Sequence, residues 1–274
     1  MDDLVRAAIL GIVQGLTEFL PISSSGHLIL VPALFEWPDQ GLAFDVGLHL
    51  GTLVALLAYF WRDWRRLLSA GLRGLARHGL NLAAQERDAQ TLWLIALGCL
   101  PAAIAGLLLA NWIEDNLRQP WLVAIMLAIA GAILYAADRF SRRDRLLGSL
   151  AFADAVAIGA AQACALIPGV SRSGATISAA LSRGFTRDAA ARFAFLLGTP
   201  TFIGAALLKS AELWGESGRD FGELAVGFTV SMLVGFSAIH WLLRYLRTRS
   251  LVPFVLYRFA VAGITLAIGA FRIA

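Results

Sequence analysis

Two polar stretches interrupt an otherwise apolar chain, and their residue types could perform nucleophilic and anion-binding chemistry. The first, residues 14–27, contains an acid, Glu18, three serines and an imidazole. The second, residues 162–176, repeats Gln, Ser, Ser and Gly at the same offsets and carries Arg172 where the first carries Ser24. Polar groups are costly inside a membrane and are typical of functional sites there. The duplication predicts that both stretches contribute to one site.

The first stretch combines a carboxylate with hydroxyls and a possible base. Gln14 and Glu18 are four residues apart, so they share one face of a helix that ends before Pro21. The serines that follow are candidate nucleophiles, and His27 next to them is a candidate base. Two alternatives remain open, namely that Glu18 is an interfacial carboxylate and that the serines are a helix cap followed by an interfacial histidine.

The second stretch has the composition of an anion site. Small residues allow close backbone approach, hydroxyls and amides can donate, and Arg172 can form a bidentate contact with phosphate. An arginine at membrane depth needs an anionic partner, and the alternative partner is Glu18 in a buried ion pair that joins the two stretches. The residues expected to contact phosphate come from both stretches: Ser23, Ser25, Gly169, Ser171, Arg172, Ser173, Gly174 and Thr176.

Composition identifies an integral membrane protein. Of the 274 residues, 58% are hydrophobic and only 15% are charged, against roughly 45–50% and about 25% in soluble domains. Uncharged windows at 89–113, 119–137 and 224–243 are long enough to cross a bilayer as helices. The net charge of +4 comes from basic residues in short loops between apolar segments, which follows the positive-inside rule and argues against a nucleic-acid partner.

The apolar segments predict an all-α protein with six transmembrane helices and two re-entrant helical hairpins. The arginine-rich segments 62–87, 139–145 and 244–249 are expected to be cytoplasmic loops. The runs 4–35 and 152–183 are broken by Pro, Gly and Ser, so each is expected to enter and leave on one side with its polar tip buried in the protein. Full crossings are expected near 43–61, 92–110, 122–138, 189–209, 223–243 and 252–271.

The two halves of the chain also match outside the polar stretches, since a Leu-Gly-Thr sequence occurs at both 50–52 and 197–199. Each half has one hairpin and three crossings. Because three is an odd number, the second half has the opposite orientation in the membrane. The sequence therefore predicts an inverted-topology repeat of about 1–148 and 149–274 within a single membrane domain, 1–274. The binding site of such a repeat is expected near the membrane midplane, between the broken elements.

The motifs resemble those of the bacterial undecaprenyl-diphosphate phosphatases, also called bacitracin-resistance proteins. QGLTEFLPISSSGH at 14–27 is similar to that family's (E/Q)GLTEFLPxSSxGH element, and PGVSRSGAT at 168–176 is similar to its PGxSRSGxT element. The resemblance covers the whole chain in length, segment order and both motifs. Many members have glutamate where this chain has Gln14, so Glu18 must carry more of any metal binding.

The resemblance implies hydrolysis of undecaprenyl diphosphate to undecaprenyl phosphate and inorganic phosphate. This reaction recycles the lipid carrier for peptidoglycan synthesis and confers bacitracin resistance. It implies a divalent cation, Mg²⁺ or Ca²⁺, held by Glu18 with Gln14, and a site in the bacterial inner membrane that opens toward the periplasm. The family's functional positions fall on Glu18, Ser24, His27 and Arg172 in this chain. Ser24 is the candidate nucleophile with His27 as base or leaving-group acid, although direct attack by His27 or by water stays open.

A transporter or flippase for polyprenyl phosphate is the competing hypothesis, because inverted repeats with broken helices are typical of transporters. Such a protein would move its lipid intact, whereas the phosphatase consumes it. The sequence does not determine the oligomeric state, and a homodimer is compatible with it.

Overall fold

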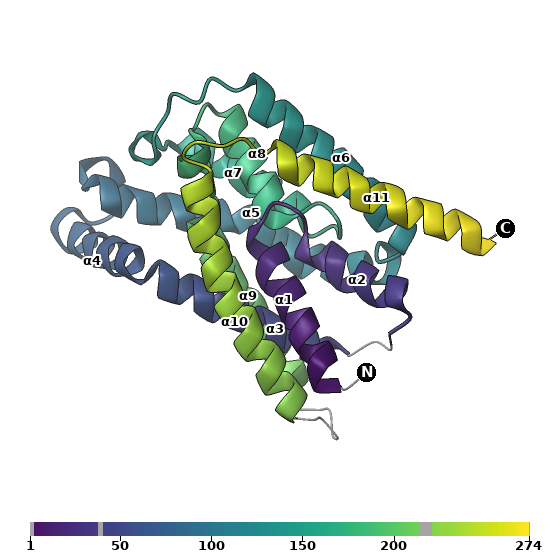
Figure 1. The fold of residues 1–274 in the computed structure, drawn as a ribbon. Helices are drawn as coiled ribbons and strands as arrows, with labels where there is room; N and C mark the ends of the chain where they lie inside the picture. The colour runs from purple at the N-terminus through teal and green to yellow at the C-terminus, as the bar shows by residue number, and fades with distance from the viewer. Residues whose placement is uncertain (1–2, 38–40, 214–220, 274) are drawn as a thin grey trace.

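The computed structural model describes residues 3–37, 41–213 and 221–273, and this part of the chain is almost entirely helical (Figure 1). It contains no β-strand beyond one isolated backbone bridge, between Arg145 and Phe185. The α-helices are α1 (Asp3–Phe19), α2 (Ser24–Phe35), α3 (Leu42–Tyr59), α4 (Trp61–His78), α5 (Arg87–Asn116), α6 (Pro120–Phe140), α7 (Phe152–Cys164), α8 (Arg172–Ser182), α9 (Arg187–Leu213), α10 (Phe221–Tyr245) and α11 (Val252–Ile273).

Five of these helices, α5, α6, α9, α10 and α11, are long and apolar enough to cross a membrane. They coincide with five of the six crossings expected from the sequence, which confirms a multi-pass, all-α integral membrane protein. The crossing expected near 43–61 corresponds to α3, which is followed after a bend of 69° by α4. The two helices make a sixth span only if they count together as one.

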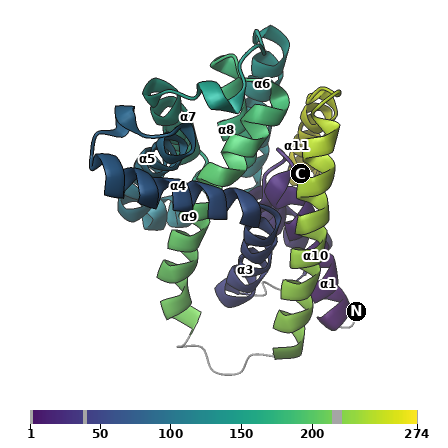
Figure 2. The ribbon, with the colours of Figure 1, turned by 90° about the vertical axis from the view of Figure 1, so that its left-hand side faces the viewer.

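The expectation of a loop over 62–87 is wrong, because most of that segment is α4. Its residues follow helical spacing, with Leu67 and Gly74 buried against the rest of the protein and Leu68, Leu72 and Leu75 exposed on an adjacent face. Arginines occupy the remaining face, and α4 runs across the direction of α9 and α10 (Figure 2). An amphipathic, basic helix of this kind is suited to lying in the membrane interface. The arginines that indicated a loop are the polar face of a helix.

The two polar stretches form helix pairs with the same turn. α1 and α2 meet at residues 20–23, and α7 and α8 meet at 165–171. The N-cap residues, Ser23 and Ser171, have positive φ values of 75° and 74°, and each side chain accepts a hydrogen bond from the amide three residues later. Serine in this backbone region costs on the order of 1–3 kcal/mol and persists only where its surroundings impose it. The two turns therefore share one backbone geometry, while the inverted repeat and the re-entrant placement of both pairs stay predictions.

Packing between the halves follows a matching pattern. α1 packs along α10, α7 packs along α5, and α6 lies beside α11 (Figure 1). A Cβ atom on Gly11 of α1 would lie 2.8 Å from the carbonyl oxygen of Gly227, and one on Gly159 of α7 would lie 2.3 Å from that of Gly98. Small residues allow membrane helices to approach this closely. In each half, the first helix of the pair therefore packs closely against the other half at a glycine, and the inverted repeat stays a prediction.

Asp154 stabilises the start of the second helix pair. Its side chain is fully buried, and its two oxygens accept hydrogen bonds from Arg145 Nη2 at 2.6 Å and Arg183 Nε at 2.7 Å. The Ala151 amide donates to the same carboxylate at 3.0 Å. This one side chain connects the segment after α6 to both ends of the α7–α8 pair.

Replacing Asp154 with asparagine should lower the free energy of unfolding by about 1–3 kcal/mol, because it leaves two arginines without their anion. The thermal unfolding midpoint in detergent measures this effect. Asp144→Asn is the matched control, since Asp144 is an exposed residue beside Arg145. Equal midpoints for the two variants would contradict the role assigned to Asp154.

Candidate active site

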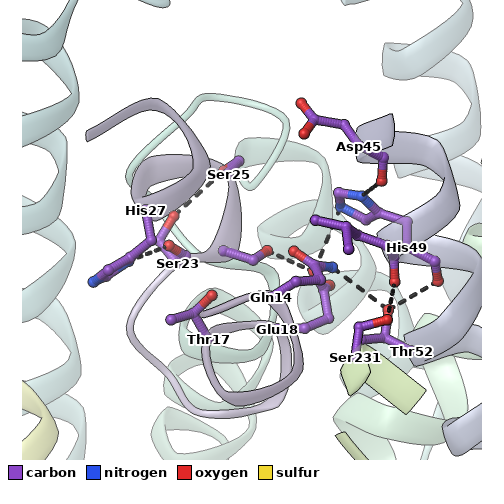
Figure 3. A network of polar contacts seen from close by, with 12 residues as sticks. Gln14, Thr17, Glu18, Ser23, Ser25, His27, Asp45, His49, Thr52 and Ser231 are labelled. Atoms are coloured by element: carbon purple, nitrogen blue, oxygen red, sulfur yellow. Dashed lines mark hydrogen bonds and ion pairs between the residues drawn. The ribbon is translucent and has the colours of Figure 1, made fainter. Parts of the chain in front are cut away.

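The carboxylate of Glu18 is the centre of a buried polar network (Figure 3). Its Oε2 accepts a hydrogen bond of 2.5 Å from Ser24 Oγ and one of 2.9 Å from Gln14 Nε2. His49 Nε2 lies 3.6 Å from the same oxygen. The four-residue spacing in α1 places Gln14 and Glu18 on one face as expected, and the turn after α1 returns Ser24 to that face. A serine hydroxyl bonded to a buried carboxylate is arranged to lose its proton.

α3 supplies further members of this network, His49 and Thr52, which were not expected from the sequence. His49 Nδ1 lies 2.8 Å from the backbone oxygen of Asp45, which can only accept, so the ring donates there and turns Nε2 toward Glu18. Thr52 Oγ1 donates to the backbone oxygen of His49 at 2.8 Å and lies 3.5 Å from Gln14 Nε2. α3 therefore fixes both neighbours of the Glu18 carboxylate.

Arg172 is the cation that the second helix pair brings to the site. Its guanidinium lies 3.8 Å from the ring centroid of Phe202, and its buried Nη1 has no hydrogen-bond partner among the described residues. The alternative ion pair between Arg172 and Glu18 is not formed in the described part of the chain, and His49 Nε2 lies 3.6 Å from the Glu18 carboxylate. A buried cation with an unused donor is prepared for an anionic ligand.

A cavity of about 280 Å³ reaches Arg172 and His49. Most of its lining is apolar and comes from α2, α3, α5 and α9, with Leu28, Ile113 and Phe202 among the larger side chains. The polar residues at its wall are Ser25, Asp45, His49, Glu114, Arg118 and Arg172. The cavity thus combines a cationic end with apolar walls, as a ligand with an anionic head and an apolar tail requires.

His27 is placed away from this network. Its Nδ1 lies 2.7 Å from the backbone oxygen of Ser23, and its Nε2 lies 2.8 Å from the hydroxyl of Tyr257, on which the ring is stacked. Figure 3 shows the ring directed away from Glu18 and Gln14. The structure therefore brings Glu18, and not His27, to the Ser24 hydroxyl.

The residues expected to bind phosphate fall into two groups. Ser25 and Arg172 line the cavity. The others build the turns: Ser23 Oγ pairs with Ser25 Oγ at 3.4 Å, and Ser171 Oγ pairs with Ser173 Oγ at 3.2 Å. Gly169 has a φ of 93°, and Gly174 and Thr176 are buried in α8. Their hydrogen bonds are made within the protein, so these residues shape the site more than they line it.

Two residues at the site were not identified from the sequence. His49 precedes the repeated Leu-Gly-Thr, which is the signal that could have placed it near Gln14. Arg258 lies inside an expected crossing and is fully buried. The rule that selected Arg172, a charge within an apolar segment, selects Arg258 equally well.

The residues around Glu18 fit a divalent cation of the Mg²⁺ or Ca²⁺ type. Gln14 Oε1 is buried without a hydrogen-bond partner, and it stands beside the Glu18 carboxylate on the same helix face. Carboxylate and amide oxygens are ligands that these cations prefer, and Mg²⁺ completes its shell with phosphate and water. No cluster of three or more His, Cys, Asp or Glu side chains is present in the described part of the chain. The donor set therefore suits a cation held jointly with a phosphate ligand.

The sequence profile described as "Bacitracin resistance protein BacA" matches residues 7–264. The chain belongs to this family. Among curated relatives, the undecaprenyl-diphosphatase of Geobacter sulfurreducens is 48% identical over 269 residues, which cover 97% of this chain and 98% of the relative. The undecaprenyl-diphosphatase of Desulforudis audaxviator is 45% identical over 260 residues, 95% of each chain, and that of Thermomicrobium roseum is 45% identical over 277 residues, 97% of this chain and 98% of the relative. The BacA family is the one whose motifs the sequence resembles.

Proposed function

We propose that this BacA-family protein hydrolyses undecaprenyl diphosphate to undecaprenyl phosphate and inorganic phosphate. The observation that carries the proposal is the Ser24 hydroxyl bonded to the buried carboxylate of Glu18 at 2.5 Å. Arg172, with an unused Nη1 donor, lines the adjacent cavity. A nucleophile, its base and an anion-binding cation are the groups that phosphoryl transfer needs.

In the first step Ser24 Oγ attacks the terminal phosphorus while its proton passes to Glu18. The bond between that phosphorus and the bridging oxygen breaks. Glu18 passes the proton to the bridging oxygen, and undecaprenyl phosphate leaves. Arg172 binds the phosphate oxygens and offsets their charge in the transition state. In the second step water attacks the phosphorus of the phosphoserine and gives a proton to Glu18. The bond between phosphorus and Ser24 Oγ breaks, Glu18 returns the proton to Oγ, and inorganic phosphate is released.

Glu18 and Gln14 would hold the divalent cation, Mg²⁺ or Ca²⁺. When bound, the cation neutralises phosphate charge and polarises the phosphorus–oxygen bonds. Gln14 also donates to Glu18 Oε2, which fixes the carboxylate next to Ser24.

The apolar walls of the cavity suit the prenyl chain of the substrate. Burying such a chain contributes about 0.8 kcal/mol per CH₂ group. Family membership supports a place in the bacterial inner membrane and a role in carrier recycling for peptidoglycan synthesis, with resistance to bacitracin as a result. We propose further that the cavity opens toward the periplasmic side.

Phosphate release by the purified protein in detergent tests the proposal. Detergent leaves no compartments, so a transporter or flippase would leave the lipid diphosphate intact. We expect stoichiometric release of inorganic phosphate and the lipid monophosphate with Mg²⁺ or Ca²⁺, and none from the Glu18→Gln variant. Intact diphosphate after incubation with folded wild-type protein and either cation would overturn the hydrolase and favour transport.

A further inference from the structure

Arg258 of α11 is a completely buried arginine that has no carboxylate partner among the described residues. Its guanidinium instead donates to four backbone carbonyls. Nε donates to the carbonyl of Leu127 at 3.0 Å, and Nη1 donates to that of Pro21 at 3.1 Å. Nη2 donates to the carbonyls of Gly169 at 2.8 Å and Val170 at 3.2 Å. Each guanidinium nitrogen therefore has a backbone partner.

These carbonyls belong to the two turns on which the site is built. Pro21 lies in the turn between α1 and α2, whereas Gly169 and Val170 lie in the turn between α7 and α8. Leu127 belongs to α6, which packs along α11. One side chain thus joins the corresponding turns of the two halves, and a bond of 3.1 Å from Ser173 Oγ to the Leu20 carbonyl is a second link between them.

Both turns require such support because their backbones are strained. Ser23 and Ser171 hold positive φ values in the region that favours glycine. Backbone of this kind persists only when the surroundings impose it. Carbonyls buried in a turn also need donors, and a charged donor meets this need more strongly than a neutral one. Arg258 supplies both the donors and the constraint.

The catalytic groups directly follow the strained residues. Ser24 is the first residue of α2 after the Ser23 cap, and Arg172 is the first residue of α8 after the Ser171 cap. The separation between nucleophile and anion-binding cation is therefore set by the relative position of the two turns. Arg258 does not line the cavity and makes its contacts behind those turns.

We propose that Arg258 is a positioning residue for the phosphatase reaction, which holds Ser24 and Arg172 in register by bonding the carbonyls of both turns. The proposal rests on the proposed function. Tyr257, its neighbour on α11, bonds the Nε2 of His27 and adds a second contact between α11 and the first helix pair. In this proposal His27 is a structural residue, which connects the first helix pair to α11 through Tyr257.

The contacts at position 258 require the planar guanidinium of arginine, with its separate N–H donors, and not positive charge alone. A lysine ammonium carries the charge but cannot reach carbonyls on three sides through separate nitrogens. Arg258→Lys and Arg258→Met should therefore have similar effects. If charge alone mattered, the lysine variant would retain activity and the methionine variant would lose it.

The test compares Arg258→Lys, Arg258→Met and a control, Arg187→Met, by phosphate release and by thermal unfolding in detergent. Arg187 is also largely buried, but it pairs with Asp138 and does not contact either turn. A misplacement of about 1 Å costs on the order of 10²-fold in rate, so we expect kcat to fall by about 100-fold in both Arg258 variants. KM should stay within about threefold, because the cavity and Arg172 still bind substrate. Arg187→Met should lower the unfolding midpoint and leave kcat of the folded protein within about threefold.

Three results would overturn the proposal. One is wild-type kcat in folded Arg258→Met, and another is wild-type kcat in Arg258→Lys alone. The third is a loss of activity in all variants that only follows the loss of folded protein. If Arg258→Met does not fold, Arg258→Ala with added guanidinium serves as the second measurement, and recovery of kcat supports the proposal while its absence in folded protein contradicts it. Failure of the proposed function is distinguishable, because wild-type protein would then release no phosphate.

Discussion

Arg172→Ala should reduce kcat/KM for phosphate release by about 10³-fold or more, since arginines that offset transition-state charge contribute roughly 10³–10⁵ in phosphoryl transfer. The physical reason is the unused donor: Arg172 Nη1 has no hydrogen-bond partner among the described residues, and the guanidinium lies over the ring of Phe202. Removing a side chain that forms no ion pair with the described residues should cost little stability, so the variant should fold. Steady-state kinetics on detergent-purified protein measure the effect.

The control for this prediction is Arg118→Ala. Arg118 also lines the cavity, but it is paired with Glu114 at 2.7 Å and is partly exposed. Exposed pairs contribute about 0–1 kcal/mol, so kcat/KM should fall by less than about tenfold. Equal losses in the two variants would show that cavity charge in general, and not the position of Arg172, supports turnover.

Ser24→Ala should be almost inactive, with kcat lowered by about 10³-fold or more, because loss of a nucleophile leaves only the contribution of binding and electrostatics. In the proposed mechanism Ser24, whose hydroxyl donates to Glu18 at 2.5 Å, is the nucleophile and the carboxylate is its base. Glu18→Gln should lose activity to a similar degree, and the double variant should be no worse than either one, because residues that act as a unit are not additive.

Ser25→Ala is the neighbouring control, since Ser25 lines the cavity and bonds the Ser23 hydroxyl but has no bond with Glu18. It should retain at least about a tenth of wild-type kcat. Phosphoserine trapped in acid-quenched wild-type protein, and absent from Ser24→Ala, reports the intermediate directly. Ser24→Ala with more than about a tenth of wild-type activity would transfer the attack to water or to His27.

The sequence was sufficient for the long apolar helices because hydropathy reports them directly. It was also sufficient for the duplicated turns, whose Ser and Gly residues are needed by the local backbone. It failed for α4, since arginines are common both in cytoplasmic loops and on the polar face of an interfacial helix. The helical spacing of the leucines and arginines distinguishes the two, and Leu67 and Gly74 are buried on one face as that spacing requires.

The candidate site could be predicted where its groups are close in sequence, as for Gln14, Glu18 and Ser24. It could not be predicted where contacts depend on distant helices. His27 is two residues after the last of the serines, but the start of α2 turns its ring toward Tyr257, 230 residues away. His49 reaches Glu18 only because α3 packs against α1. Adjacency in sequence indicated His27 as the base beside Ser24, whereas the structure places Glu18 at the Ser24 hydroxyl and His49 near Glu18.

The mainly apolar lining of the cavity determines which concentration governs the rate. A substrate whose prenyl chain remains in lipid never enters bulk water, so it reaches Arg172 by lateral diffusion in the plane of the bilayer. Turnover then follows the mole fraction of substrate among the surrounding lipids or detergent molecules, and added detergent acts as a diluent even at constant molarity. For a protein with this cavity, KM is therefore a mole fraction of substrate in the lipid or detergent phase, and not a concentration in bulk water.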